Sequence, residues 1–225
     1  MKLLALRGRN LTSLADEFSI DFTAEPLRSA GLFAITGPTG AGKSTLLDAI
    51  CLALYDRLPR LDGADSGTVG RDEARGTSYD DVRNILRHGE GAAFAEVEFL
   101  GQDHRRYKAR WEVNRAHSRA DGRLQAQKML LIDLESGQAL GDKKTETLRL
   151  TAEKVGLSFD QFRRAVLLAQ GEFDTFLKAR SKDRAELLER ITGTEIYSRV
   201  SQAAHERAKA ERDGMRALQQ QLAAQ

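Results

Sequence analysis

The feature that most constrains the fold of this chain is a glycine-rich turn between an apolar run and an amphipathic helix. The turn spans Gly37 to Ser44 and has the spacing Gly-x-x-x-x-Gly-Lys-Ser. Residues 32–35 form the apolar run before it, and apolar residues at helical spacing follow it. This order is typical of an α/β fold in which the turn lies between a buried strand and a helix. The pattern therefore predicts a buried parallel strand over residues 32–35 and a helix that ends near Tyr55.

Each residue type in the turn suits the binding of a nucleoside triphosphate. Glycines let the backbone approach the phosphates, and the N-terminus of the helix adds unpaired N–H groups and a partial positive charge. Lys43 is expected to reach the β- and γ-phosphates as a catalytic residue, and the hydroxyl of Ser44 is expected to hold Mg²⁺. The sequence thus predicts ATP and Mg²⁺ as cofactors. The predicted nucleotide contacts are Gly37, Pro38, Thr39, Gly40, Ala41, Gly42, Lys43, Ser44 and Thr45.

The composition indicates a folded protein with a heavily charged surface. Hydrophobic residues make up 41% of the 225 residues and charged residues 30%, which is enough for one sizeable core. The net charge is only +2, so any contact with nucleic acid must come from a local patch. The N-terminus is too soon charged for a signal peptide, and no apolar run has the length of a membrane span. We therefore expect a cytoplasmic protein without a membrane partner.

The pattern along the chain changes from strands to helices. Strands are predicted at residues 2–9 and 17–22, before the glycine-rich turn. Residues 57–80 are rich in Gly, Asp, Ser and Arg, and we predict that they form a mobile insertion. Runs of alternating residues between turn sequences predict an antiparallel β meander within residues 93–140. The strands of this meander are expected at residues 93–100, 105–113 and 124–134.

The last third of the chain has a helical pattern. A helical part is expected over residues 145–191, and Ser158-Phe-Asp-Gln161 has the spacing of a capping box. Residues 194–225 contain no proline and have a partly apolar 3-4 spacing. They are predicted to start a coiled coil that continues past residue 225, the alternative being an isolated surface helix. Residues 1–193 are then expected to form an N-terminal ATPase lobe.

A second acidic site is needed for ATP hydrolysis, namely an aspartate at the end of a buried strand that holds Mg²⁺ through water. The candidate is Asp133, which follows four apolar residues. However, a polar hairpin sequence comes directly after it, and it lies within the predicted antiparallel meander. A magnesium aspartate should instead end a parallel strand beside the glycine-rich turn. We therefore interpret Asp133 as a hairpin residue and the chain as half of an active site.

Several blocks of sequence occur in a fixed order. They are Asn10-Leu-Thr-Ser-Leu14, the stretch from Gly31 to Tyr55, Leu167-Leu-Ala-Gln-Gly-Glu-Phe173, Asp183-Arg-Ala-Glu-Leu-Leu-Glu189 and Thr192-Gly-Thr-Glu-Ile-Tyr197. In this order they resemble the N-terminal part of the bacterial SbcC family, which are DNA-repair ATPases of the SMC-like branch of the ABC superfamily. The resemblance implies an α/β, ABC/SMC-type P-loop NTPase lobe with an antiparallel β meander, a helical subdomain and the start of a coiled coil. The tract 57–80 departs from the family pattern because it is longer and richer in glycine and charge.

The resemblance also assigns site residues. The Q-loop glutamine of the family falls on Gln170, which would be catalytic and a Mg²⁺ ligand. From the sequence alone, a Gln before a Gly at a helix end is equally compatible with a polar surface residue. Arg9 and Asn10 match a basic–Asn pair that lies near the nucleotide phosphates. The Walker B aspartate, the catalytic glutamate and the signature motif belong to a C-terminal lobe and are not visible in this chain.

The same resemblance implies a function and its partners. This lobe would hydrolyse ATP only with the C-terminal ATPase lobe of the same protein, and two heads would form a homodimer over two nucleotides. Opening and closing would gate access of double-stranded DNA to the SbcD nuclease, an exonuclease and endonuclease that also cleaves hairpins, in DNA repair, recombination and replication. The alternatives are an SMC- or RecF-like structural DNA clamp without a nuclease and a free-standing P-loop kinase.

One strand carries candidate contacts to DNA. Arg106, Lys108 and Arg110 share one face of the strand predicted over residues 105–113, and Tyr107 and Trp111 share the other. A solvated outer face over a packed inner face explains this alternation without DNA. Phosphate contact is the alternative, and it would be sensitive to salt.

Overall fold

The computed structural model describes residues 1–61, 68–69, 77–78, 80–165 and 195–223. The chain divides into two compact units, Met1–Phe162 and Arg163–Gln225. Most of the predicted insertion over residues 57–80 lies outside the described residues, and so do the blocks at residues 167–173 and 183–191. The predicted lobe boundary at residue 193 lies outside them as well and stays a prediction.

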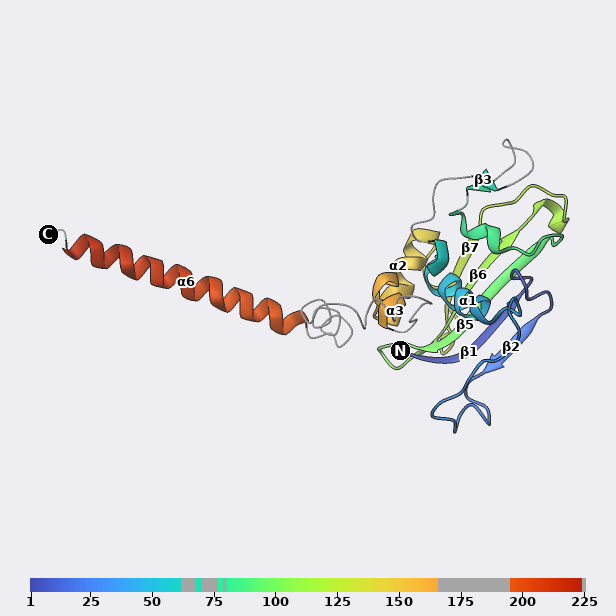
Figure 1. Cartoon of the computed structure of the whole chain (residues 1–225), viewed down its shortest axis with the longest axis horizontal. Helices are drawn as coiled ribbons and strands as arrows, with labels where there is room; N and C mark the ends of the chain where they lie inside the picture. The colour runs from blue at the N-terminus through green and yellow to red at the C-terminus, as the bar shows by residue number, and fades with distance from the viewer. Residues whose placement is uncertain (62–67, 70–76, 79, 166–194, 224–225) are drawn as a thin grey trace. The chain divides into compact units, whose positions relative to one another are not determined.

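The first unit is built on a five-stranded sheet with the order β2-β1-β5-β6-β7 (Figure 1). Every neighbouring pair is antiparallel, and β5, β6 and β7 follow one another as the predicted meander. The first strand has the predicted bounds, and the others start or end within a few residues of the expected ones. The strands are β1 (Lys2–Arg9), β2 (Phe18–Asp21), β5 (Ala92–Leu100), β6 (Arg106–Asn114) and β7 (Lys128–Asp133).

Short elements connect these strands. Between α1 and β5, two short strands pair antiparallel with each other in a separate sheet. These short elements are η1 (Pro59–Leu61), β3 (Thr68–Val69), β4 (Thr77–Ser78), η2 (Val82–Ile85) and η3 (Ala116–Ser118). The described part of the predicted insertion therefore contains a short 3-10 turn and a two-stranded pairing.

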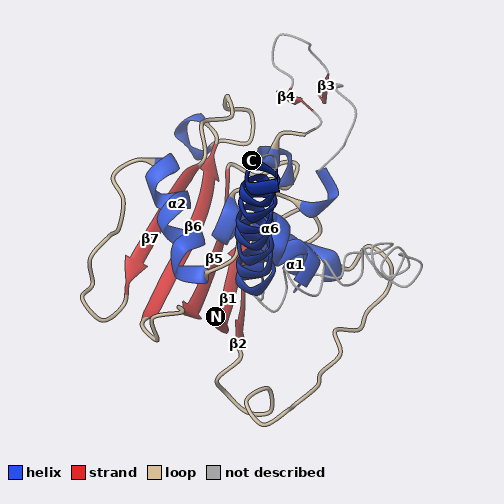
Figure 2. Ribbon diagram, turned by 90° about the vertical axis from the view of Figure 1, so that its left-hand side faces the viewer, coloured by secondary structure: helices blue, strands red, loops and turns tan. Residues whose placement is uncertain are grey.

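Helices cover one face of the sheet (Figure 2). Helix α1 (Lys43–Tyr55) packs against β5 and β6, and α2 (Lys144–Val155) packs against β7 and α1. Every second residue of β5 and β6 faces these helices and is buried, as a period of two requires, and Glu96 of β5 is buried on the opposite face. Trp111, Tyr107 and Phe99 are the largest of these buried side chains, each with no exposed surface. The hydrophobic core of the first unit therefore lies between α1, α2 and the sheet.

Polar contacts fix the ends of these helices. Asp56 is the C-cap of α1, and its carboxylate accepts a hydrogen bond from the indole N–H of Trp111 at 2.6 Å and forms an ion pair with Lys144 at 2.5 Å. The predicted capping box is confirmed at the start of α3 (Phe159–Ala165). There the N–H of Ser158 donates to Oε1 of Gln161 at 2.9 Å, and the N–H of Gln161 donates to Oγ of Ser158 at 3.3 Å.

The second unit contains α6 (Glu195–Ala223), a helix of 29 residues. Its described side chains are exposed, including Val200 at 60% and Met215 at 61%. The prediction of a helix here is confirmed, and its entry into a coiled coil stays a prediction. None of the helices in the described ranges is both long enough and apolar enough to cross a membrane.

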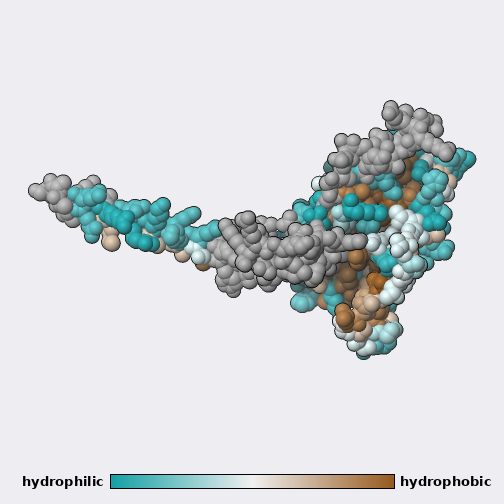
Figure 3. Space-filling model, viewed as in Figure 1, coloured by the Kyte–Doolittle hydropathy of each residue, from teal (hydrophilic) through white to brown (hydrophobic). Residues whose placement is uncertain are grey.

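The predicted buried strand over residues 32–35 is wrong. The structure has no strand there, and Leu32, Phe33 and Ile35 are 93%, 48% and 48% exposed. A parallel strand needs a parallel neighbour, whereas the described sheet is entirely antiparallel and ends at the short strand β2. Figure 3 shows apolar surface at the lower end of the first unit, where this segment lies. The apolar run is therefore largely exposed, and the ring of Phe33 has the ring of Phe22 as a neighbour, with 6.1 Å between their centres.

Candidate nucleotide-binding site

The glycine-rich turn has the backbone that the sequence pattern requires. Gly40 and Gly42 have φ angles of 83° and 94°, which side chains with a Cβ rarely adopt. Gly42 is also the N-cap of α1, and a Cβ added to it would lie 2.7 Å from Cδ2 of Leu14. Both glycines therefore permit a tight turn that delivers the chain into the first turn of α1.

Lys43 and its neighbours lie in that first turn. The Nζ atom of Lys43 donates hydrogen bonds to the carbonyl oxygens of Gly37 and Pro38, each at 2.8 Å. Ser44 is exposed, whereas Thr45 is only 5% exposed. No acidic residue stands in the first turn of α1, so the partial positive charge of the helix N-terminus is not offset there. A cation, a free hydroxyl and a helix N-terminus thus meet at one end of α1, an arrangement that can hold phosphate oxygens and Mg²⁺.

Arg9 and Asn10 lie where β1 ends and the following loop begins. Arg9 is exposed. Asn10 is 4% exposed, and its Nδ2 atom donates to the carbonyl oxygen of Ala92 at 2.8 Å and to Oε2 of Glu90 at 3.2 Å. Both amide hydrogens are therefore engaged within the protein. The predicted contact of these two residues with a nucleotide stays a prediction.

Comparisons with known proteins identify the family of this chain. The AAA domain family matches residues 5–225. The chain belongs to this family. This chain is similar to the SbcC component of the nuclease SbcCD from Pseudomonas aeruginosa, with 52% identity over 223 residues, which is 99% of this chain and 18% of the relative. The predicted resemblance to SbcC is thereby confirmed.

Two further relatives extend this similarity. The SbcC component of the nuclease SbcCD from Rhodobacter capsulatus is 48% identical over 93% of this chain and 17% of the relative. The DNA double-strand break repair Rad50 ATPase of Methanopyrus kandleri is 30% identical over 78% of this chain and 18% of the relative. The chain thus spans less than a fifth of the length of each of these three relatives.

Asp133, the candidate magnesium aspartate of the sequence, lies in a hairpin. It is 3% exposed and accepts hydrogen bonds from the N–H groups of Glu135 at 2.9 Å and Ser136 at 3.3 Å. Its second oxygen forms an ion pair with Arg105 at 2.7 Å. These contacts stabilise the turn after β7, as the interpretation of Asp133 as a hairpin residue requires. Gln170 lies outside the described residues.

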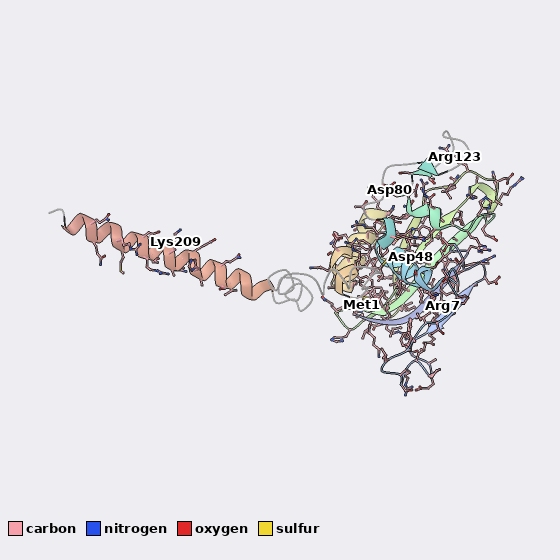
Figure 4. The ribbon with its side chains drawn as sticks, viewed as in Figure 1. Met1, Arg7, Asp48, Asp80, Arg123 and Lys209 are labelled. Atoms are coloured by element: carbon pink, nitrogen blue, oxygen red, sulfur yellow. The ribbon has the colours of Figure 1, made fainter. Side chains whose placement is uncertain are left out.

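Asp48 is a buried acid that the sequence pattern did not single out. It lies on α1 one helical turn after Ser44, is 4% exposed, and is labelled in Figure 4. Burial raises the pKa of Asp48, and the nearby Arg60, whose Nε is 3.4 Å from Oδ2, opposes that rise. In the described part of the chain no group of three or more His, Cys, Asp or Glu could hold a metal, so Asp48 is not part of such a cluster there. An aspartate within the apolar run of α1 was the signal available in the sequence.

The candidate DNA face, which is the face of β6 with Arg106, Lys108 and Arg110, carries acidic as well as basic side chains. Arg110 on β6 forms ion pairs with Glu96 at 3.0 Å and with Glu112 at 3.3 Å, and its guanidinium lies 3.9 Å from the ring centre of Phe94. These partners come from β5 and β6 themselves. The charge of Arg110 is therefore largely offset on its own sheet.

The other two candidate DNA contacts, Arg106 and Lys108, also lie beside acidic residues of the sheet. Arg106 lies 3.5 Å from Glu98, and Arg7 of β1, labelled in Figure 4, forms ion pairs with both Glu96 at 3.1 Å and Glu98 at 2.6 Å. Lys108 stands opposite Glu98 in the strand register. The three predicted DNA contacts thus share one face, as expected, but in a mixed network and not in a basic stripe. Their contact with DNA stays a prediction.

Proposed function

We propose that this chain is the ATP-binding half of an SbcC-type ATPase and that it hydrolyses ATP only together with a second lobe. The observation that carries the proposal is Lys43 at the N-terminus of α1, next to the exposed hydroxyl of Ser44 and after a turn built on Gly40 and Gly42. ATP would bind along residues 37–45, with Lys43 on the β- and γ-phosphates. Arg9 and Asn10 would lie nearby.

The magnesium ion would be shared between this turn and other parts of the protein. The hydroxyl of Ser44 is the ligand that the described residues offer, and Gln170 is the second ligand that we propose. Asp133 is occupied by its own hairpin and cannot serve. The acid that holds the metal through water would therefore come from a C-terminal lobe of the same protein.

The apolar surface beside the turn supports a second lobe. Leu32, Phe33, Ile35 and Leu47 are each at least 41% exposed, and they lie just before the turn and on α1. Apolar side chains that gather at one place on a surface mark a site of interaction. Strands of a C-terminal lobe would pair with residues 32–35 and supply the parallel neighbours that the described sheet lacks.

The wider role follows from the relatives. They are named as the SbcC component of the nuclease SbcCD and as a DNA double-strand break repair Rad50 ATPase. We propose that two such heads form a homodimer over ATP in the cytoplasm, at the nucleoid. Their opening and closing would control access of double-stranded DNA to an SbcD nuclease. An SMC- or RecF-like clamp would bind no nuclease, so recovery of a nuclease with the full-length protein separates the two.

ATP hydrolysis by the 225-residue chain, alone and mixed with the C-terminal lobe, tests the proposal. The chain alone should bind ATP but turn it over slowly, and the mixture should be at least about tenfold faster, since the missing groups stabilise the transition state. Lys43→Ala should abolish the gain, whereas Lys128→Ala, at an exposed lysine of β7, should not. Full activity of the chain alone would contradict the half-site and favour the kinase alternative.

A further inference from the structure

The loop after β1, residues 10–14, has an unusual backbone. Thr12 has a φ angle of 43° and Asn10 one of 54°, both in the left-handed region. Asparagine tolerates this region, but for a β-branched residue such as threonine it is strained. A strained residue persists only where its surroundings fix it, and such residues cluster at functional sites.

The backbone of Thr12 is fixed on both sides by one segment. Its N–H donates to the carbonyl oxygen of Ile85 at 2.8 Å, and its own carbonyl oxygen accepts from Nη1 of Arg87 at 2.7 Å. The N–H of Arg87 in turn donates to the carbonyl oxygen of Asn10 at 2.9 Å. Three hydrogen bonds thus hold the loop against residues 85–87, which lead into β5.

The side chains of this loop reach the nucleotide site. Oγ1 of Thr12 lies 3.0 Å from Oγ1 of Thr45, which is buried directly after Ser44. Leu14 packs closely on Gly42, so that a Cβ added to Gly42 would lie 2.7 Å from Cδ2 of Leu14. The loop therefore contacts the N-cap and the first turn of α1, where phosphate and Mg²⁺ are expected.

We propose that Thr12 is a positioning residue for nucleotide binding, acting through the hydroxyl of Thr45 on the first turn of α1. The hydroxyl pair holds that turn in the orientation that presents Lys43 and Ser44. Because the backbone of Thr12 is bound to Ile85 and Arg87, a shift of the turn on nucleotide binding passes to the segment before β5. This inference rests on the proposed function, since it assumes that ATP binds at this turn.

Four variants of the full chain test it: Thr12→Val, Thr12→Ser, Thr45→Val and the double valine variant. The readouts are the dissociation constant of a fluorescent ATP analogue with Mg²⁺ and hydrogen exchange of the Arg87 amide with and without nucleotide. Thr12→Val keeps the shape and removes the hydroxyl, so binding should weaken about three- to tenfold, the worth of one hydrogen bond. Thr12→Ser should bind within about twofold of the unchanged chain.

The remaining variants test whether the hydroxyls of Thr12 and Thr45 act as one interaction. Thr45→Val should weaken binding as much as Thr12→Val, and the double variant should be no weaker than either, because both remove the same interaction. Nucleotide should change exchange at Arg87 in the unchanged chain and in Thr12→Ser, and not in the valine variants. A purely structural role would lower the urea midpoint of all variants without altering that response.

The outcomes separate the two proposals. If the unchanged chain does not bind the ATP analogue, the proposed function fails and this inference with it. If the unchanged chain binds and Thr45→Val binds equally well, with the Arg87 response intact, the inference alone is overturned. Thr45→Val decides this even if the valine at the strained position 12 prevents folding.

Discussion

The inner face of the antiparallel sheet and the lead-in segment, residues 32–35 before the glycine-rich turn, differ sharply in their exposure to solvent. On the inner face of the sheet, Trp111, Tyr107 and Phe99 have no exposed surface, whereas Leu32 in the lead-in segment is 93% exposed. Both regions are apolar, so hydrophobicity alone does not explain the difference. The sheet packs against α1 and α2 within the first unit, whereas residues 32–35 pair with no strand of the described sheet, and the ring centres of Phe33 and Phe22 lie 6.1 Å apart.

The difference teaches which part of the fold is complete in this chain. Strands β5, β6 and β7 follow each other in sequence and pair antiparallel, so each strand brings its own neighbour. A parallel strand obtains its neighbours from distant parts of a chain or from another lobe. The sheet should therefore respond strongly to changes in its own core, and the lead-in segment should respond only when a second lobe is present.

Among substitutions expected to leave the chain folded, the largest effect is expected at Trp111. Trp111→Ala removes a fully buried indole and leaves Asp56 without one of its hydrogen-bond donors. We expect the free energy of unfolding to fall by about 3–5 kcal/mol, as for other buried aromatic residues. Urea denaturation followed by far-UV circular dichroism measures this change.

Trp111→Phe separates packing from the hydrogen bond. It keeps most of the ring and loses the N–H, so the cost should be smaller, about 1–3 kcal/mol for the lost hydrogen bond to a carboxylate. Gln127 and Lys144 still contact Asp56 and limit that cost. Equal losses in the two variants would show that the sheet core depends on the polar contact and not on packing.

Elements defined by local chemistry were predictable from sequence. The apolar-rich run of residues 2–9 was predicted as a strand with the bounds of β1, and the spacing of Ser158 and Gln161 predicted the cap of α3, because these patterns depend on neighbours a few residues away. The glycine spacing predicted the turn before Lys43 for the same reason. Local rules of this kind need no knowledge of tertiary contacts.

Features that depend on distant pairing were not predictable. The exposure of residues 32–35 follows from which strands share a sheet, and no pattern in the run itself reveals it. Likewise, Arg110 stands opposite Glu96 only in the observed register of β5 and β6, so the sequence showed a basic face and the structure shows a mixed one. The strained loop at Thr12 is held by residues 85–87 and has no local signature.

A smaller effect is expected at the rim of the sheet, in the hairpin between β5 and β6. Desolvation would raise the pKa of Asp103, but hydrogen bonds from Lys154 at 2.9 Å and from Tyr107 at 2.7 Å outweigh it and lower the pKa to about 2. A carboxylate with a lowered pKa adds stability above its unfolded pKa, near 4, and this is lost as the pH falls through about 2.

The contribution of the Asp103 carboxylate is measured by comparing the free energy of unfolding of the unchanged chain with that of Asp103→Asn. At pH 7 the variant should be less stable, by under about 1 kcal/mol because the Asp103–Lys154 pair is partly exposed and screened by solvent. The difference should shrink between pH 4 and pH 2. Asp121→Asn, at an exposed acid outside this cluster, should show no such trend. A difference that persists below pH 2 would assign the effect to packing of the hairpin and not to charge.

The smallest effect on stability, and the sharpest test of the comparison, is expected at Leu32. Leu32→Asp places a charge on a side chain that is already exposed, so the free energy of unfolding of this chain should change by less than about 0.5 kcal/mol. The matched change Leu54→Asp, at a fully buried leucine of α1, should unfold the chain, since it buries an unpaired charge. Binding to the C-terminal lobe, measured by calorimetry, should be lost in Leu32→Asp while the fold remains intact. If Leu32→Asp instead unfolded the chain alone, the lead-in segment would be part of its core, and the difference between the two regions would disappear.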